Sequence, residues 1–536
     1  MNYQEALAYL YSLSDFERSG AYTRSPEENL PREARLLELL GKPQQGYTCT
    51  LIAGTKGKGS TAALIERVLR QAGVRTGLYT QPDLHTFRER MRVNGNLISE
   101  REAAELLTEI RAVVEAIQGR QEFGPYITYE VATALALLYF RRQQVQHAVL
   151  EVGLGGRLDA TNVTQPLVSV ITSISYDHMQ ILGNTLREIA TEKAGIVKPN
   201  GVVVTSAQPV EALLAIAAAC QKQHARLVRV GPDGDEQTGI SVKGTEHQEG
   251  VAARFIARGG VGGHQPSHAL PPGAMNCAPT PLNVTPMGQD EQTGRGQAPP
   301  VHLGYVEGAQ LPPVSYRYRQ EEHTEDYQRF TVWTPARTYS GLEIPLRGRH
   351  QLENAAAALA TLDMLRERGI EWDEAALRQG FRLVRWPARI EVVGHHPTIV
   401  VDGAHNADSM QKLVAALRDT FTMQRLIVVL SPNRDKDLAG IARALAGVDV
   451  VVLTRMANPR AATIAELQAT FGEYAPSVTI ESASDSTRAM GLALELAGSE
   501  DLICATGSLY LAAEVLRWSA ARGDREAAAT IEGVDH

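Results

Sequence analysis

Residues 50–69, TLIAGTKGKGSTAALIERVL, decide the fold of this chain. An apolar run ends at Ala53, a glycine-rich turn follows, and residues 60–69 carry apolar side chains at helical spacing. In such a strand, turn and helix, glycines let backbone N–H groups approach phosphate oxygens, and the helix N-terminus adds partial positive charge. The stretch therefore predicts a phosphate-binding loop.

Side chains of the loop also suit a bound nucleotide. Lys58 places a full positive charge near the terminal phosphates, and the hydroxyl of Ser60 or Thr61 can reach a magnesium ion. The loop departs from the common Walker pattern because Gly59 separates Lys58 from Ser60. A glycine-rich turn alone more often serves tight geometry, but the strand, the lysine and the two hydroxyls favour phosphate binding here. The predicted contacts are Gly54, Thr55, Gly57, Lys58, Gly59, Ser60 and Thr61.

The rest of the chain repeats the alternation of short apolar runs and amphipathic helical patterns, which is typical of α/β proteins with a parallel sheet. The first series of strands is expected at 48–53, 75–80, 147–152, 167–174 and 201–206. A second series begins near Trp386, with strands expected at 398–401, 425–430, 448–453, 477–480 and 501–505. We predict a phosphate-loop domain with a mainly parallel sheet, followed by a smaller Rossmann-like α/β domain.

The composition of the chain indicates where the two domains meet. We place them at residues 1–384 and 385–536, with a hinge around 383–389. Residues 231–327 are rich in Gly, Pro, Gln and His and lose periodicity, which predicts a mobile insertion, to which we assign no function. Helices are expected within 1–45, at 131–140 as a buried helix, and at 354–366.

The overall composition excludes several classes of protein. The chain has 536 residues with 53 basic and 61 acidic side chains, a net charge of -8, so it lacks the basic surface that nucleic-acid binding requires. Its start, MNYQE, lacks the features of a signal peptide, and the apolar stretch 131–140 is too short to span a bilayer. Four single cysteines, Cys49, Cys220, Cys277 and Cys504, form no zinc or dithiol motif and suit a reducing compartment. We expect a monomeric cytoplasmic enzyme that binds neither nucleic acid nor membranes.

Two polar residues follow predicted strands at the edge where ligands of open α/β sheets bind. Glu151 follows the apolar residues 148–150 at the end of the predicted strand 147–152, and His178 lies just beyond 167–174. A carboxylate and an imidazole there could share a metal ion with nucleotide phosphates. The alternatives are a solvated carboxylate at the strand end and a hydrogen-bonded loop histidine, which for a lone histidine is the commoner case.

Seven short sequence motifs resemble those of a known family and occur in the same order as in that family. The chain resembles the folylpolyglutamate synthases, including their bifunctional dihydrofolate synthase forms, within the Mur ligase superfamily. The resemblance covers the chain except the insertion and both extreme ends. The motifs are AGTKGKGST at 53–61, EVGLGGRLDATN at 151–162, DH at 177–178, EKAGIVKP at 192–199, HQLEN at 350–354, WPAR at 386–389 and DGAHN at 402–406.

The resemblance implies roles for residues around the loop. Lys58 and the loop amides would hold ATP phosphates, while Glu151 and His178 would ligate Mg²⁺. From the loop itself we add the hydroxyl of Ser60 to the predicted metal ligands. Lys193 matches a lysine that the family carboxylates with carbon dioxide, whereas taken alone it is an ordinary lysine in a last helical turn. Lys58, Lys193 and His178 are thus the predicted catalytic residues.

Further matches imply substrate contacts. Asn354, Arg389, Asp402 and His405 match positions that contact the nucleotide, although alone Asn354 resembles a helix cap and Arg389 a surface residue. The expected pterin-side contacts are Thr128, Tyr129, Glu130, Leu158, Asp159 and Ala160.

Three departures from the family stand out. Lys56 replaces the family's usual asparagine and places an extra cation beside the phosphates. The word QPDL at 81–84 replaces Ser-Pro-His-Leu and removes a serine expected at the magnesium ion. Either the amide oxygen of Gln81 or the carboxylate of Asp83 could take its place, and we assign the metal contact to Gln81. The insertion is the third departure.

The implied reaction is the ATP-dependent addition of L-glutamate to a folate, through an acyl phosphate. Dihydropteroate is an alternative acceptor, and neither the acceptor nor the length of the glutamate chain can be inferred from the residues. Two other functions stay open: another Mur-type amino-acid ligase, or a nucleotide-binding protein that has lost ligase chemistry.

Overall fold

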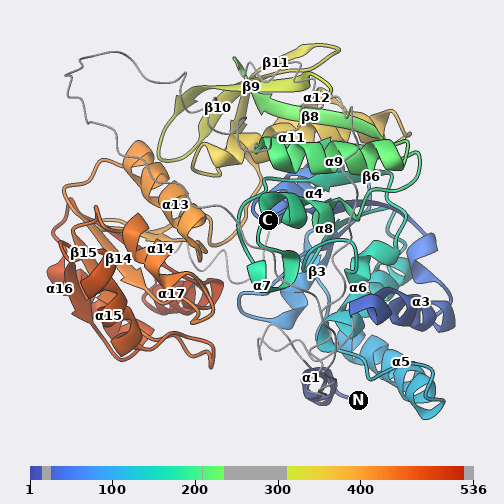
Figure 1. The fold of residues 1–536 in the computed structure, drawn as a ribbon, viewed down its shortest axis with the longest axis horizontal. Helices are drawn as coiled ribbons and strands as arrows, with labels where there is room; N and C mark the ends of the chain where they lie inside the picture. Colours follow the sequence, from blue (N-terminus) through green and yellow to red (C-terminus); the bar gives the residue numbers. More distant parts are fainter. Residues whose placement is uncertain (15–25, 208, 235–310, 524–536) are drawn as a thin grey trace, which may run out of the picture. The chain divides into compact units, whose positions relative to one another are not determined.

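A computed structural model describes residues 1–14, 26–207, 209–234 and 311–523. Its strands form two sheets, one of eleven strands and one of six. Figure 1 separates them by colour, the first sheet in blue to yellow and the second in orange to red. The expected α/β class with two sheets is confirmed, while the domain boundary at residue 385 stays a prediction.

The first sheet is parallel at its centre, in the order β8-β7-β6-β1-β5-β2. These six strands include all five that the first series predicted. Antiparallel neighbours extend the sheet at each end, β3 and β4 beside β2, and β10 and β11 beyond β9. The bounds are β1 Thr48–Ala53, β2 Thr76–Tyr79, β3 Met91–Val93, β4 Asn96–Leu97, β5 His147–Glu151, β6 Val168–Ile171, β7 Val202–Thr205, β8 Arg226–Pro232, β9 Val314–His323, β10 Gln328–Trp333 and β11 Thr338–Ile344.

Strand β9 corrects the predicted insertion at 231–327. It pairs in parallel with β8 and antiparallel with β10, and β8 itself extends to Pro232. The prediction was wrong at both borders. At the first, Gly231 and Pro232 are typical of turns but belong to β8. At the second, the exposed side chains of β9 are polar or charged, so its sequence, VSYRYRQEEH, has no apolar run. Such alternation is typical of the antiparallel part of a sheet that packs one face on the core and exposes the other to solvent. Residues 235–310, with Cys277 among them, lie outside the described residues.

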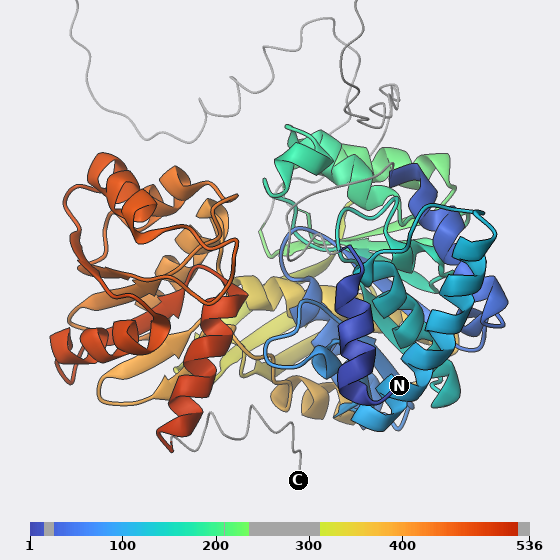
Figure 2. The ribbon, with the colours of Figure 1, turned by 90° about the horizontal axis from the view of Figure 1, so that it is seen from below.

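Helices bury both faces of the first sheet. Neighbouring residues of β1 point to opposite faces, since Leu51 packs into one apolar cluster and Ile52 into the other. Helices α1, α5 and α6 belong to the first cluster, and α4, α11 and α12 to the second. In Figure 2, α1 in dark blue lies beside α5 in cyan, which agrees with their packing. The bounds are α1 Tyr3–Ser12, α3 Asn29–Leu39, α4 Lys58–Gln71, α5 Glu100–Gly119, α6 Thr128–Arg142, α7 Met179–Leu182, α8 Leu186–Ala194, α9 Val210–Lys222, α11 His350–Arg366 and α12 Glu374–Arg382.

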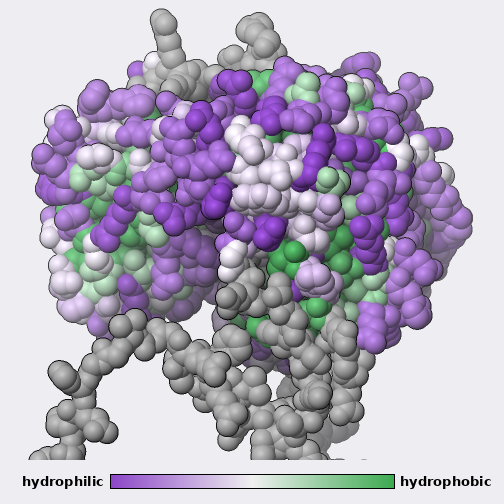
Figure 3. Space-filling view, turned by 90° about the horizontal axis from the view of Figure 1, so that it is seen from above, coloured by the Kyte–Doolittle hydropathy of each residue, from purple (hydrophilic) through white to green (hydrophobic). Residues whose placement is uncertain are grey.

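The predicted helices are confirmed, and residues 131–140 of α6 are buried throughout. Among the described residues, no helix combines the length and apolar character needed to cross a membrane. Over the face shown in Figure 3, hydrophilic residues in purple predominate, and hydrophobic residues in green lie in separate areas.

The second sheet has the order β12-β13-β17-β14-β15-β16 and is parallel except for β12. Five of its strands match the second predicted series, and β12 was not predicted. Apolar clusters again lie on both faces, as expected of a Rossmann-like unit. The bounds are β12 Glu391–Gly394, β13 Thr398–Val401, β14 Leu426–Leu430, β15 Val450–Leu453, β16 Thr479–Ser482 and β17 Leu502–Thr506, with helices α13 Ala407–Thr420, α14 Leu438–Ala444, α15 Ile464–Tyr474, α16 Ser486–Leu496 and α17 Leu509–Ala521.

Helix α3 carries an unusual buried charge. Arg32 is fully buried and donates from Nε and Nη2 to the carboxylate of Glu130, at 3.0 and 2.5 Å. The adjacent Glu33 is also fully buried, and neither of its carboxylate oxygens has a hydrogen-bond partner among the described residues. Burial, together with the nearby Glu130, raises the pKa of Glu33 well above its ordinary value of 4.5.

Glu33→Gln is expected to stabilise the protein increasingly as the pH rises. With a raised pKa, the folded state keeps a proton that the unfolded state loses above pH 4.5, so stability present below pH 4.5 is lost at higher pH. The variant's gain in unfolding free energy should grow with pH by up to about 1.4 kcal/mol per unit. Urea unfolding at pH 5, 6 and 7 measures this gain. Glu38→Gln, on the exposed side of α3, is the control, and an equal gain at all three pH values would contradict the assignment.

Candidate active site

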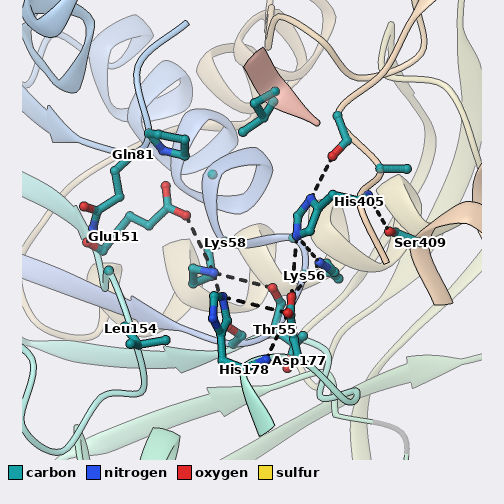
Figure 4. Close-up of a pocket in the computed structure, with 18 of the residues that line it drawn as sticks. Thr55, Lys56, Lys58, Gln81, Glu151, Leu154, Asp177, His178, His405 and Ser409 are labelled. Carbon is teal, nitrogen blue, oxygen red and sulfur yellow. Dashed lines mark hydrogen bonds and ion pairs between the residues drawn. The ribbon is translucent and has the colours of Figure 1, made fainter. Parts of the chain in front are cut away.

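One cavity of about 450 Å³ brings together most of the residues that the sequence singled out. The phosphate loop, the ends of β5 and β6, the first turn of α11 and the segment after β13 all line it. Figure 4 shows Lys58, Glu151, His178 and His405 converging on this space. The parallel order of the strands explains the convergence, because their carboxyl ends meet at one edge of the sheet.

Two glycines of the phosphate loop are required by close contacts. Gly57 has φ +89°, and a Cβ there would lie 2.2 Å from Oδ1 of Asn354 on α11. Gly54 has φ +149°, and its Cβ would lie 1.8 Å from Oγ1 of Thr172. Any side chain would therefore displace a neighbour as well as strain the backbone. The loop is held between the end of β6 and the start of α11.

Among the described residues, Lys58 has weak partners only. Its Nζ donates to the carbonyl oxygens of Gly54 and Thr55 at 3.2 and 3.5 Å and lies 3.9 Å from Oε1 of Glu151. Neutral carbonyls of the same loop are easily exchanged for a charged phosphate. Ser60 also lines the cavity, whereas Thr61 is fully buried and does not.

Glu151 and Gln81 line the cavity, and each has one buried side-chain oxygen without a hydrogen-bond partner among the described residues. Gln81 donates from Nε2 to the carbonyl oxygen of Glu151 at 3.4 Å and to the hydroxyl of Tyr129 at 3.3 Å. Because a carbonyl only accepts, this fixes the amide with Oε1 on the other side. That atom and Oε2 of Glu151 are buried without a hydrogen-bond partner among the described residues. Asp83 is instead paired with Arg90, at 2.6 Å from its Nε.

The donor set fits a hard cation such as Mg²⁺, which prefers carboxylate, amide and hydroxyl oxygens. No group of three or more His, Cys, Asp or Glu side chains in the described part of the chain could hold a metal by itself. A metal would therefore also need Gln81, Ser60 or phosphate oxygens. Burial raises the pKa of Glu151 to about 7, while the positive charge of Lys58 lowers it.

His178 and Lys193 line the same cavity from the β6–α7 segment and α8. Burial lowers the pKa of His178 to about 3, so the imidazole is neutral and its nitrogens can bind a metal. Burial and the nearby charge of Lys58 lower the pKa of Lys193 to about 7. The amine of Lys193 makes no hydrogen bond or ion pair with the described residues.

The predicted nucleotide contacts of the second half also face this cavity. Asp402 follows β13, and its carboxylate accepts hydrogen bonds from the backbone N–H groups of Ile390 and Ala404 at 3.0 and 2.7 Å. Arg389 donates from Nη1 to the carbonyl of Ala388, and Asn354 donates to Gln351. Their contact with ATP stays a prediction.

A cluster of polar and charged side chains joins the phosphate loop to the segments that follow β13 and β14 of the second sheet. Lys56 Nζ donates to Oδ2 of Asp177 at 2.9 Å and lies 2.8 Å from Nε2 of His405. Lys436, which follows β14, donates to Oδ1 of Asp177 at 2.9 Å. Lys56 and Lys436 thus share the carboxylate of Asp177, and His405 lies beside Lys56. The sequence placed the charge of Lys56 beside the phosphates, but the structure pairs it with Asp177.

Most of the residues predicted to contact the pterin do not line the cavity, and several of their side chains hydrogen-bond to other residues of the protein. Tyr129 alone of these six residues lines the cavity. Its hydroxyl donates to Asp159, which also accepts from the backbone N–H groups of Gly153 and Leu154. Glu130 pairs with Arg32, as described above. The carboxylates of Glu130 and Asp159 thus shape the wall of the site. The six contacts with folate, including those of Thr128, Leu158 and Ala160, stay a prediction.

Sequence reasoning missed some residues that line the cavity. Lys436 is one, although it follows the predicted strand 425–430 and the rule applied to Glu151 would have found it. Arg32, His350, Glu353 and Lys412 are others, and they lie on helices, where no comparable rule applies.

Family comparisons agree with this geometry. The Mur ligase middle domain matches residues 52–262, and the Mur ligase, glutamate ligase domain matches residues 388–509. Folylpolyglutamate synthase of Lacticaseibacillus casei is 30% identical over 520 residues, which cover 96% of this chain and 98% of that protein. Dihydrofolate synthase/folylpolyglutamate synthase of Bacillus subtilis is 29% identical, with the same two coverages.

The fold is similar to solved structures. Mycobacterium tuberculosis folylpolyglutamate synthase complexed with ADP aligns with a TM-score of 0.75 at 27% identity, over 96% of this chain and 98% of that one. E. coli FolC in complex with DHPP and ADP aligns with a TM-score of 0.72 at 25% identity, over 98% and 99%. Fold, sequence and motif order therefore agree over nearly the whole length. This chain is an ATP-dependent ligase and belongs to the folylpolyglutamate synthase and dihydrofolate synthase family of the Mur ligase superfamily.

Proposed function

We propose that this protein uses ATP to join L-glutamate to the carboxylate of a reduced folate, with dihydropteroate as a second acceptor. The observation that carries the proposal is the single cavity in which the phosphate loop faces Glu151, Gln81, Lys193 and the Asp402–His405 segment. Phosphoryl transfer to a carboxylate needs a loop that binds the phosphates and oxygen donors that hold a metal ion. It also needs residues on the opposite side of the cavity that position the substrates.

The reaction needs a leaving group, because a carboxylate is unreactive toward amines. The folate carboxylate attacks the γ-phosphorus of ATP, the bond to the bridging oxygen breaks, and ADP leaves. Lys58 turns from the loop carbonyls to the phosphates and stabilises the charge that develops there. The amine of glutamate then attacks the acyl carbon, phosphate leaves, and the amine loses a proton to the medium.

Mg²⁺ supplies charge neutralisation on the transferred phosphate when it is bound. Glu151, Gln81, Ser60 and His178 are the residues of this chain that would hold it, because their donor atoms face the cavity or are buried beside it. Gln81 stands where the family has a serine, and because an amide and a hydroxyl are both neutral, the total charge of the metal ligands is unchanged.

A carboxylated Lys193 would add an anion to the same site. Formation of a carbamate requires a neutral amine, and a pKa lowered to about 7 makes a large share of the amine neutral at physiological pH. The described residues leave the amine without a partner, so nothing has to be displaced.

Exclusion of water protects an acyl phosphate from hydrolysis. Closure about the segment 383–389 would provide it, with substrates bound between the two halves of the cavity. The hinge, the monomeric state and the cytoplasmic location are further parts of the proposal, and they rest on the sequence.

Purified protein supplied with ATP, Mg²⁺ and L-glutamate is expected to add glutamate to tetrahydrofolate. Mass spectrometry of the product, with dihydropteroate in a parallel reaction, identifies the acceptor, and ADP release should require both acceptor and glutamate. Lys58→Met is the control and should lower the rate by at least about a hundredfold. Another Mur-type ligase would leave both acceptors unchanged, and a nucleotide-binding protein would bind ADP without turnover.

Gln81→Leu is expected to weaken metal binding, because it keeps the size of the side chain but removes the amide oxygen. Electron paramagnetic resonance of Mn²⁺ in the presence of ADP should show an affinity lower by about tenfold or more. Gln81→Ser, which restores the family's hydroxyl, should retain most of the affinity. If Asp83→Asn weakens Mn²⁺ binding and Gln81→Leu does not, Asp83 is the ligand.

Lys193 is expected to carry a carboxyl group in the presence of bicarbonate. Methylation of the carbamate with an oxonium reagent, followed by peptide mass spectrometry, would trap the modification. Lys198 is an internal control, because its Nζ already donates to the carbonyl and to Oδ1 of Asn162, both at 2.8 Å. Equal labelling of both lysines, or none on Lys193, would argue against the assignment.

A further inference from the structure

Lys56 and Lys58 lie two residues apart in one loop, yet their partners differ in kind. Lys58 donates to neutral carbonyls of its own loop, and a carboxylate oxygen of Glu151 lies beyond hydrogen-bond distance, 3.9 Å from its Nζ. Lys56 instead donates to a carboxylate and reaches a residue that follows β13 of the second sheet. Lys56 thus has a carboxylate at hydrogen-bond distance, 2.9 Å, whereas the carboxylate of Glu151 lies 3.9 Å from Lys58. Of the two lysines, Lys58 is the one that a phosphate can draw away from its present partners.

The geometry of His405 shows what the contact with Lys56 does. A protonated amine can only donate, so Nε2 of His405 must accept from Lys56. Its proton then sits on Nδ1, which donates to the carbonyl oxygen of Gly403 at 2.9 Å. Lys56 therefore holds the ring of His405 in one tautomer and one orientation at the wall of the cavity (Figure 4).

Asp177 is shared between the two halves of the cavity. One carboxylate oxygen accepts from Lys56 of the phosphate loop and the other from Lys436 of the second half. Asn406, the residue after His405, also donates to Asp177 and to the carbonyl of Tyr176, both at 3.4 Å. The side chains of Asp177 and Lys436 are only 8% and 10% exposed, so solvent screens these contacts weakly.

We propose that Lys56 is a positioning residue that holds the loop half of the cavity against the half that follows β13 before any nucleotide binds. Its partners for this role are Asp177 and His405, and Lys436 secures Asp177 from the other side. Lys56 does not bind the phosphates of the nucleotide. The inference deepens the proposed function, on which it rests for the reaction that the positioned site performs.

Lys56→Asn tests the proposal, because it introduces the residue usual in the family, which is too short to span from the loop to both partners. Double electron–electron resonance between spin labels at positions 101 and 488, whose side chains are 82% and 75% exposed, measures the separation of the two halves. The labels require a Cys277→Ser background, since Cys49, Cys220 and Cys504 are buried. Lys56→Met, Lys436→Met and their double variant complete the set.

In the unliganded protein, the distance distribution is expected to be narrow, and Lys56→Asn should add a population with longer distances. The affinity for ADP should change by less than about threefold, because Lys58 and the loop amides are intact, while kcat falls by about tenfold or more. The effects of Lys56→Met and Lys436→Met on the distances should not be additive, since both lysines hold one carboxylate. Arg226→Met, which removes an exposed ion pair with Glu367, is the control and should change neither quantity.

Two outcomes would overturn the proposal. One is an affinity for ADP lowered tenfold or more with unchanged distances, which would make Lys56 a phosphate ligand. The other is an unchanged distance distribution in Lys56→Asn, whatever the activity. Both measurements use nucleotide alone or no ligand, so they remain informative if the acceptor proves not to be a folate.

Discussion

The site depends on the parallel pairing of β1 with both β5 and β6. In this register Ile52 lies opposite Glu151, and Ala53 lies opposite Ile171, so the three strands end at the same edge. Each strand delivers a different group beyond that edge: the phosphate loop, a carboxylate, and the segment with Asp177 and His178. A slip of one residue would turn each side chain to the opposite face, so burial of both faces secures the arrangement.

Much of this could be predicted from the sequence, because central parallel strands are short apolar runs and their carboxyl ends carry the ligands. Glu151 and His178 were placed by that rule and Asp402 by the family resemblance, and the structure brings all three to one cavity. The glycines of the loop were recognised because they let backbone N–H groups approach phosphate, and the structure adds a second requirement at Gly57, where a Cβ would lie 2.2 Å from Oδ1 of Asn354.

Other features escaped prediction because they depend on contacts between distant residues. Strand β9 is amphipathic and charged, so only its pairing with β8 and β10 reveals it. The partner of Lys56 lies 121 residues away, and nothing in the loop itself indicates that Asp177 takes its charge. Glu130 and Asp159 were both expected to contact the pterin, yet their carboxylates accept hydrogen bonds from Arg32 and Tyr129. A motif identifies where a residue lies in the chain. The role of its side chain depends on the hydrogen-bond and ion-pair partners that the fold brings to it.

The parallel pairing of β8 with β9 sets a lower limit on the chain that joins them. Parallel neighbours cannot be joined by a tight hairpin, since the second strand begins at the edge opposite to that where the first one ends. A crossover of roughly a dozen residues is the least that returns the chain. The connection between Pro232 and Val314 must keep at least such a crossover, because a two-residue turn would force β9 to reverse its direction and lose its register with β8.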